Sequence, residues 1–346
     1  MSRVLALVVL VGVADQKLST QYAPERAFRV EATTTLKMET TASRFERDGE
    51  PVDRGGRGGG GRVEMKRHAI HVDRVLAAEG ERPTKVRRSF EEVEATASVS
   101  FGGESRELES DCPLSGTVLE LTADGDDVDV EAVEGSPPAE ALEGHRPRLA
   151  LDALLPDGEV AVGRSWTLGN DAIRRALGLD VSKALFPPPA PPEDGDGGGR
   201  GGRGGGRGMR GGGDGRLLEQ AEWEGKATLA ALDDEHEGQA CARIEIEIRA
   251  EGELPEPQLG GFGGGRGGAF QPEAGALVLR ENTYEIRLEG KLLFALETRL
   301  PVLLELEGQA RHESKTERTV RDSTIYMETT REGALEHRVT LTRHEE

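Results

Sequence analysis

Apolar and polar residues alternate with a period of two along most of this 346-residue chain, and no other feature constrains its fold as strongly. Side chains on a β-strand point alternately to opposite faces, so this pattern predicts strands with one buried and one solvated face. In the first such segment, residues 28–39, one face comprises Phe28, Val30, Ala32, Thr34, Leu36 and Met38. The residues between them, on the other face, are charged or are threonines.

The same pattern predicts further strands at 117–122, 128–133, 222–232 and 239–251. In the C-terminal third, a run of hairpins is expected from strands at 276–289, 291–296, 300–311, 319–329 and 335–342. Helical patterns do not alternate with these strands, which argues against a βαβ architecture. The predicted fold class is mainly β: a curved, meandering antiparallel sheet, open or half-barrel-like, with one or two short helices.

One helix is predicted over residues 171–179. Asn170 or Asp171 can cap its N-terminus, and Gly178 favours its end. Its apolar face comprises Ile173, Ala176 and Leu177. The segment 69–80 fits either a strand or a helix, and its pattern does not distinguish them.

Three tracts rich in arginine and glycine interrupt the alternation, at 54–62, 195–216 and 260–268, and prolines at 187–192 precede the second. Glycine at this density neither buries a core nor holds a regular backbone, so long disordered loops are expected. The tracts resemble RNA-binding repeats, but apart from Phe262 they lack the interleaved aromatic residues on which bases stack.

The second tract divides the chain into a β segment at 15–186, a disordered insertion at 187–216 and a hairpin segment at 217–346. Neither β segment has a pattern that closes a sheet by itself. The two are therefore expected to complete one domain, and two β subdomains joined by a linker are the alternative.

Residues 1–14 have the layout of a secretory signal peptide. Arg3 supplies a positive charge, residues 4–13 are apolar or small, and Ala14 precedes the polar Asp15. A membrane span needs about 20 apolar residues, and this run is roughly half that length. The sequence predicts an exported protein, periplasmic or extracellular, that does not span the membrane.

The formal net charge is −20, from 64 acidic and 44 basic residues. Such a surface repels nucleic acid and anionic lipid and favours solubility, cations or basic partners. The two cysteines, Cys112 and Cys241, could form a disulfide in an exported protein, which would contribute about 4–5 kcal/mol in the loop-entropy model. Two separate thiols are the alternative, and the sequence does not decide between them.

The chain carries no sequence signature of catalysis: it lacks a Gly-x-Ser-x-Gly elbow, a Cys–His signature and a His-Glu-x-x-His helix. His68, His71 and Glu64 would suit a metal only on a helix, and the acidic cluster at 124–129 lacks the spacing of a calcium loop. No catalytic residue, metal or cofactor is therefore predicted. A glycosidase-like carboxylate pair would leave no such signature, so an unrecognised hydrolase stays as a lesser alternative.

The stretch Leu-Leu-Pro-Asp-Gly-Glu-Val-Ala-Val-Gly-Arg-Ser-Trp at 154–166 resembles the "lpdg-v-vGdsW" segment of uncharacterised exported proteins from planctomycete-type bacteria. Further resembling pieces lie at 82–90, 113–118, 289–294 and 304–308. The resemblance implies an open, strongly curved sheet similar to lipoprotein carriers, whose concave face holds an acyl chain. Gly163 and Trp166 would be structural, and Arg164 replaces the usual acidic residue.

The leading hypothesis is a non-enzymatic protein that binds an apolar small molecule or lipid on the concave face of the sheet, with the helix 171–179 as a lid. Long alternating strands with few helices leave an aliphatic face that needs a cover. The alternative is a structural or interaction module with a fully buried face and an envelope protein as partner. The candidate ligand-binding residues are Leu36, Met38, Ile286, Leu288, Phe294 and Leu296.

Overall fold

The structure is a computed structural model that describes residues 15–52, 61–101, 104–110, 112–125, 127–186, 214–254, 274–320 and 323–344. The predicted signal peptide and most of the three Arg/Gly tracts lie outside the described residues. The last residues of the predicted insertion, 214–216, begin a helix, α3 (Asp214–Gln220).

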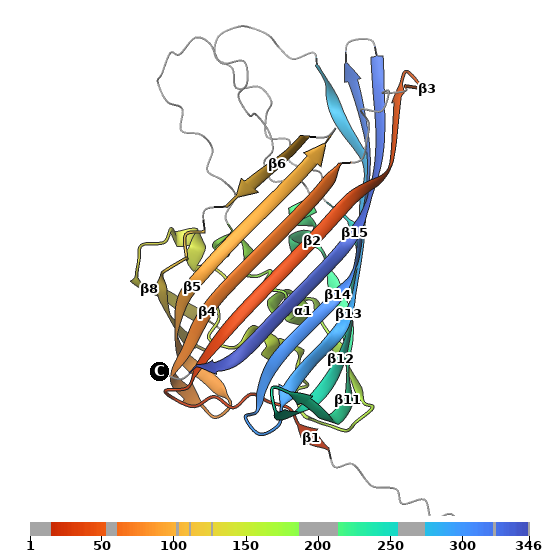
Figure 1. The fold of residues 1–346 in the computed structure, drawn as a ribbon. Helices are drawn as coiled ribbons and strands as arrows, with labels where there is room; N and C mark the ends of the chain where they lie inside the picture. Colours follow the sequence, from red (N-terminus) through yellow and green to blue (C-terminus); the bar gives the residue numbers. More distant parts are fainter. Residues whose placement is uncertain are drawn as a thin grey trace, which may run out of the picture.

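A 13-stranded antiparallel sheet dominates the described chain (Figure 1). Its main path runs β10-β11-β12-β13-β14-β15-β2-β4-β5-β7-β8. Two short strands lie off this path: β3 (Glu50–Pro51) pairs with β2, and β6 (Glu104–Glu109) pairs with β5. The path strands are β10 (Ser165–Leu168), β11 (Trp223–His236), β12 (Gln239–Glu253), β13 (Ala274–Ala295), β14 (Leu300–Val320), β15 (Ser323–His344), β2 (Ala27–Arg47), β4 (Arg62–Glu79), β5 (Arg82–Phe101), β7 (Val118–Asp124) and β8 (Asp127–Glu134). The two ends of the path do not pair, so the predicted open, curved antiparallel meander is confirmed.

Both halves of the chain build this sheet. β2 pairs along nearly its whole length with the last strand, β15. β10 precedes the second Arg/Gly tract in the sequence and pairs with β11, which follows it. A separate small ladder joins β1 (Gln16–Lys17) to β9 (Glu159–Val160).

The C-terminal third contains three long strands where shorter hairpins were predicted. β13, β14 and β15 have 22, 21 and 22 residues, so the predicted breaks at Gly290 and near Gly333 are wrong, and the segment 319–329 spans a strand end. At these two positions the neighbouring backbone is too close for any residue with a side chain, so glycine is required inside the strand. A Cβ atom would lie 1.8 Å from the Glu305 carbonyl oxygen at Gly290, and 1.6 Å from that of Lys37 at Gly333.

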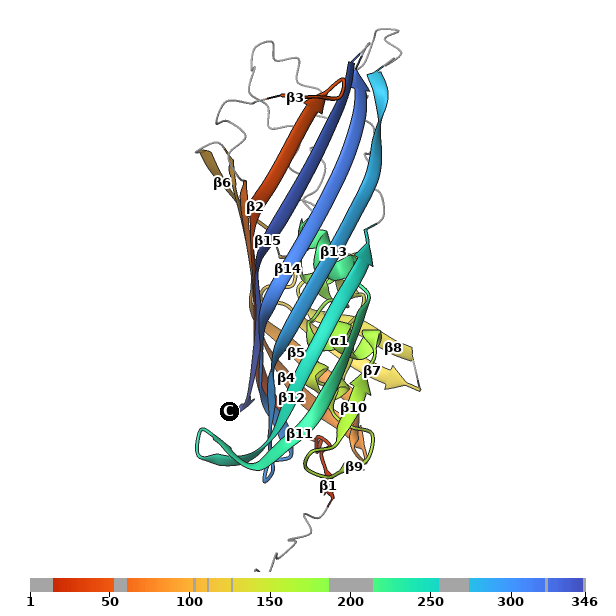
Figure 2. The same cartoon turned by 90° about the vertical axis from the view of Figure 1, so that its right-hand side faces the viewer.

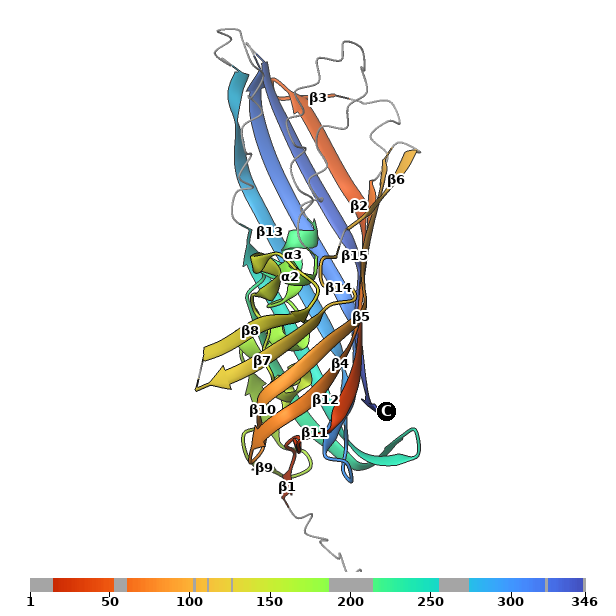
Figure 3. The same cartoon turned by 90° about the vertical axis from the view of Figure 1, so that its left-hand side faces the viewer.

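The concave face of the sheet holds a layer of short helices (Figures 2 and 3). This layer comprises α1 (Asn170–Ala176), α2 (Ser182–Leu185), α3 and the 3-10 helices η1 (Ala139–Leu142) and η2 (Ala150–Leu154). The predicted helix at 171–179 is α1, but Gly169 caps it, and Asn170 instead accepts a hydrogen bond from the backbone of Trp223 at 2.9 Å. Among the described residues, no helix has the length and hydrophobicity that crossing a bilayer would require.

The period-two pattern separates the two faces of the sheet. On β12, Ile244, Ile246 and Ile248 are buried in the concavity, whereas Glu245 and Glu247 between them are exposed. The outer face is crossed by ion pairs, such as that of Glu305 on β14 with Lys291 on β13 at 3.3 Å. Burial of the aliphatic face under the helices, at about 25 cal/mol per Å² of apolar surface, is the main stabilising contribution.

Strands β13 to β15 and β2 continue past the helical layer (Figure 2). Apolar residues on the concave face are buried only in the part of the sheet that the helical layer covers. Ala310 on β14 and Leu335 on β15 are buried, whereas Met327, further along β15, is 41% exposed.

Candidate functional site

A cavity of about 750 Å³ lies between the concave face of the sheet and the helical layer. The sheet contributes Val30 and Ala32 from β2, Ala69 from β4, and Val339 and Leu341 from β15. The opposite wall comes from the segment that joins η1 to α2, with Leu149, Leu151, Leu177 and Leu179, and from Phe186 directly after α2. The space is therefore bounded by aliphatic side chains together with polar and charged ones such as Thr34, Arg67 and Asp180.

A buried ion pair forms part of the sheet wall. Asp73 on β4 lies opposite Arg88 on β5, and Nε and Nη2 of Arg88 donate hydrogen bonds to its two carboxylate oxygens at 2.6 and 2.7 Å. Burial acts to raise the pKa of Asp73, but the charge and hydrogen bonds of Arg88 outweigh it and hold that pKa below its usual value. Both groups are charged and well satisfied.

His145, from the segment before η2, completes the surroundings of Arg88. Its Nε2 lies 3.1 Å from the carbonyl oxygen of Ala141, which can only accept, so Nε2 carries the proton. Its Nδ1 then accepts from Nη1 of Arg88 at 3.4 Å. Burial and the Arg88 charge lower the pKa of His145 to about 3, so the ring is neutral at neutral pH.

His71 on β4 also faces the cavity. Its Nε2 is 3.7 Å from Asp73, beyond hydrogen-bond distance, and its buried Nδ1 has no hydrogen-bond partner among the described residues. Burial lowers the pKa of His71 to about 4, against the opposing charge of Asp73. A neutral imidazole with an unsatisfied nitrogen is thus available to a molecule in the cavity.

His337 on β15 fastens α1 to the sheet. Its Nε2–H donates to the carbonyl oxygen of Ala176 at 3.1 Å, and its Nδ1 accepts from the hydroxyl of Thr34 at 2.9 Å. Burial lowers the pKa of His337 to about 4. In the neutral ring Nδ1 accepts from the Thr34 hydroxyl, whereas in a protonated ring Nδ1–H would donate to the same hydroxyl.

A second polar contact anchors α2 and α3. Arg67 on β4 donates to the hydroxyl of Ser182 at 2.7 Å and to the carboxylate of Glu219 at 3.0 Å, and Ser182 also donates to Glu219. The guanidinium lies 5.2 Å from the ring centre of Phe186, within the range of a cation–π contact. The helices are therefore held by specific polar contacts as well as by apolar packing.

A second, more polar cavity of about 730 Å³ adjoins the first. Thr20 and Tyr22, near the start of the described chain, donate hydrogen bonds to the two oxygens of Asp152 on η2, the latter at 2.5 Å. Burial raises the pKa of Asp152, and the two hydroxyls oppose that shift. The N-terminal segment is thereby fixed against η2.

The predicted ligand-binding residues do lie on or beside the concave face, but within the packed core. Leu36, Met38, Ile286, Leu288 and Phe294 are at most 1% exposed, and Leu296 packs against the same cluster. None of the six lines either cavity. The helical layer, including the predicted lid α1, fills the space in front of them.

The motif residues and the cysteines lie elsewhere. Gly163 adopts a φ of +83° in the turn before β10. Trp166 on β10 donates from Nε1 to the carbonyl oxygen of Leu154 at 3.0 Å, which ties the edge strand to η2. Cys112 and Cys241 are both thiols, so the structure corresponds to the second of the two alternatives left open by the sequence.

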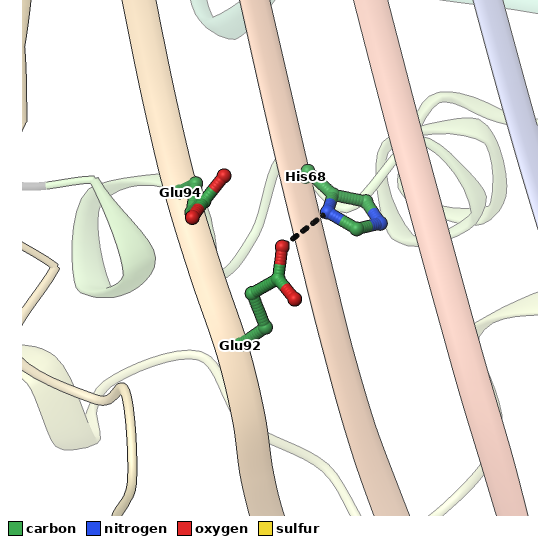
Figure 4. A group of neighbouring side chains, drawn as sticks. All are labelled: His68, Glu92 and Glu94. Carbon is green, nitrogen blue, oxygen red and sulfur yellow. Dashed lines mark hydrogen bonds and ion pairs between the residues drawn. The ribbon is translucent and has the colours of Figure 1, made fainter.

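A histidine–glutamate cluster lies on the outer face of the sheet (Figure 4). His68 on β4 lies opposite Glu94 and beside Glu92 on β5, with one ligand atom of each residue within 4.8 Å of the others. These donors could hold a divalent cation. Glu92 and Glu31 already contact the two nitrogens of His68, at 3.1 and 3.3 Å, so both ring nitrogens are engaged by carboxylates. The strand also places His71 on the opposite face, so the helical His68–His71 pair does not exist.

The sequence analysis considered His71 only as a metal ligand on a helix, and it missed the other polar cavity residues, Asp73, Arg88 and His145. A signal was available for Asp73 and Arg88, because each lies two residues from a buried valine on the same strand, Val75 and Val86. A charged residue at a core-facing position indicates a paired charge or a site. His145 lies in a segment without periodicity and gave no signal.

No protein-family model matches this chain, and no curated protein matches it either. Among solved structures, it is similar to a chain in a structure described as "Lipid-protein interactions in lipovitellin", with 5% identity and a TM-score of 0.30. The match covers 94% of this chain and 26% of the other, so the present chain spans about a quarter of that protein chain. A likeness this distant carries no argument about fold or function.

Proposed function

We propose that this chain is a non-enzymatic binding protein that holds an apolar or amphipathic small molecule between the concave face of its sheet and its helical layer. The observation that carries the proposal is the cavity of about 750 Å³. Small-molecule sites typically measure roughly 300–1,000 Å³ and combine an apolar lining with a few polar groups.

This partly open cavity is far larger than the voids inside ordinary protein cores, which seldom exceed a water molecule. Water would gain few hydrogen bonds along the wall formed by Val30, Ala32, Val339 and Leu341. An apolar molecule would bury these side chains and its own surface together. The unsatisfied Nδ1 of His71 offers one point at which a hydroxyl or amide could orient it.

The titration behaviour of the cavity residues supports binding over catalysis. The pKa values of His71, His145 and His337 are about 4, 3 and 4, far below the range that suits a general base near neutral pH. Asp73 and Arg88 are engaged with each other. We further propose that the protein acts after export, as the signal-like residues 1–14 suggest, in the periplasm or outside the cell.

The test is native mass spectrometry of the chain purified from its own source, followed by organic extraction. The wild type is expected to carry an apolar molecule in a 1:1 complex. Ala69→Phe, which fills the cavity from β4, should lose it, whereas Thr33→Phe, which adds the same bulk on the outer face of β2, should retain it.

A structural or protein-interaction role is the second candidate, because the helices bury the predicted face at Leu36, Met38 and Ile286 completely. A ligand-free wild type, together with unchanged behaviour of Ala69→Phe, would favour that role.

A further inference from the structure

Three arginines meet where the two cavities adjoin. Arg82 at the start of β5, Arg148 before η2 and Arg175 on α1 line both spaces, together with Asp152 and Ala153. They come from separate parts of the chain that the fold brings to one wall. This shared wall forms one end of the aliphatic cavity.

Among the described residues, none of these three arginines donates a hydrogen bond to a carboxylate. Arg82 has no ion-pair partner within the described part of the chain. Arg148 is 3.8 Å from Asp152, and Arg175 is 4.0 Å from Asp180; both distances exceed a hydrogen bond. Nε of Arg175 is buried and has no hydrogen-bond acceptor in the described residues.

The carboxylates nearby do not compensate for these charges. Asp152, on the shared wall, already accepts hydrogen bonds from Thr20 and Tyr22. Asp180 lies nearer to Arg174, at 3.5 Å, and lines only the first cavity. The other acidic residues line one cavity each and stand outside the shared wall, namely Glu79, Glu81, Asp124, Asp157 and Asp171, besides the paired Asp73.

We propose that Arg82, Arg148 and Arg175 bind the anionic end of an amphipathic molecule whose apolar part occupies the aliphatic cavity. This inference rests on the proposed function and names its ligand class: a chain or ring system ending in a carboxylate or phosphate. The planar guanidinium fork matches both oxyanions, and hydrogen bonds to charged groups are among the stronger ones in proteins.

The overall charge of −20 makes this local arrangement selective. The field of the protein repels an anion elsewhere on its surface, so an anionic molecule is stabilised only where arginines outnumber available carboxylates. The apolar cavity beside them supplies the remaining affinity.

The experiment is calorimetric titration of the delipidated full chain with palmitate, hexadecyl phosphate and the uncharged hexadecanol. In the wild type at low salt, at least one of the two anionic probes is expected to bind roughly tenfold more tightly than the alcohol, as one charge-assisted hydrogen bond would give. Which of the two binds better distinguishes a carboxylate from a phosphate ligand. Arg82→Gln and Arg175→Gln should remove most of this preference and leave the affinity for hexadecanol unchanged.

Arg164→Gln is the matched control, because Arg164 is exposed and lines neither cavity; it should keep the preference. Equal affinity of the wild type for all three probes would overturn the anionic-end proposal and leave the proposed function standing. Binding of none of them would contradict both. Retained hexadecanol binding in the glutamine variants shows that their cavity is intact.

Discussion

Asp73 and Arg88 face each other on neighbouring strands inside the concavity, as a bidentate ion pair whose side chains are only 3% and 10% exposed. Such a pair requires complementary partners, because removing one leaves the other as an uncompensated buried charge. Arg88 also joins the sheet to the helical layer through His145 and the carbonyl oxygen of Arg146. The pair therefore fixes the shape of the cavity wall.

Asp73→Asn is expected to lower the free energy of unfolding by roughly 3–5 kcal/mol, since Arg88 loses its counter-charge. The double variant Asp73→Leu/Arg88→Leu should be more stable than the single one. Urea unfolding measures both. Arg249→Gln is the control, because its pair with Glu224 is exposed and should contribute little to stability; an equal loss in the control and in Asp73→Asn would contradict the buried-pair account.

Stability should fall as the pH drops from about 6.5 towards 4. The folded-state pKa values of His71, His145 and His337 are depressed from 6.5 to about 4, 3 and 4, so the unfolded chain binds more protons in this window. At about 1.4 kcal/mol per pKa unit, each fully shifted histidine contributes roughly 3–5 kcal/mol near neutral pH that is lost on acidification. Asp73, whose pKa is also lowered, adds a further loss at lower pH, below its usual value.

The measurement is urea unfolding at several pH values between neutrality and pH 4. His337→Gln should flatten the dependence, because it removes one of the three buried rings. A wild-type stability that stays constant over this window would show that the three rings are not neutral and buried.

Glycines inside the long strands should be intolerant of any side chain. At Gly308 a Cβ atom would lie 1.9 Å from the Arg287 carbonyl oxygen, so Gly308→Ala must displace backbone and is expected to cost about 3 kcal/mol or more. Gly158→Ala is the control, because nothing lies within 4 Å of its added Cβ. Thermal unfolding of the two variants would distinguish them, and equal midpoints would show that the strands do not approach so closely.

The two cysteines should react as thiols at different rates. Cys241 is buried on β12, and burial raises the pKa of its thiol, which lowers the thiolate fraction. Cys112 is only partly buried. Mass spectrometry after alkylation should therefore show Cys112 modified first in the native protein and both modified after denaturation without reductant. A mass consistent with a Cys112–Cys241 bridge would reverse this assignment.

The alternation of residues predicted the sheet, its curvature class and the identity of its buried face. It did not predict where strands end. Glycine is typical of turns, but Gly290 and Gly333 lie in the middle of strands, where the backbone of the neighbouring strand comes too close for any side chain. The segment 300–311 belongs to a strand that continues to Val320 without an aliphatic stripe, so periodicity could not mark its end.

The site was harder to predict than the fold. The aliphatic residues Leu36 and Met38 are core residues, because the helices occupy the concavity in front of them. The cavity lies beside them, where His71, Asp73 and Arg88 interrupt the apolar face. A pattern that records only apolar and polar positions does not show which part of a buried face packs against protein and which part borders a cavity.

Anomalous diffraction from crystals of the full chain grown with a bromine-labelled fatty acid would show whether an apolar molecule occupies the space between β4 and the helical layer. A bromine peak is expected inside the cavity bounded by Val30, Ala69 and Leu179, and no such peak in the Ala69→Phe variant. A peak only on the outer surface of the wild type, or none at all, would contradict that expectation.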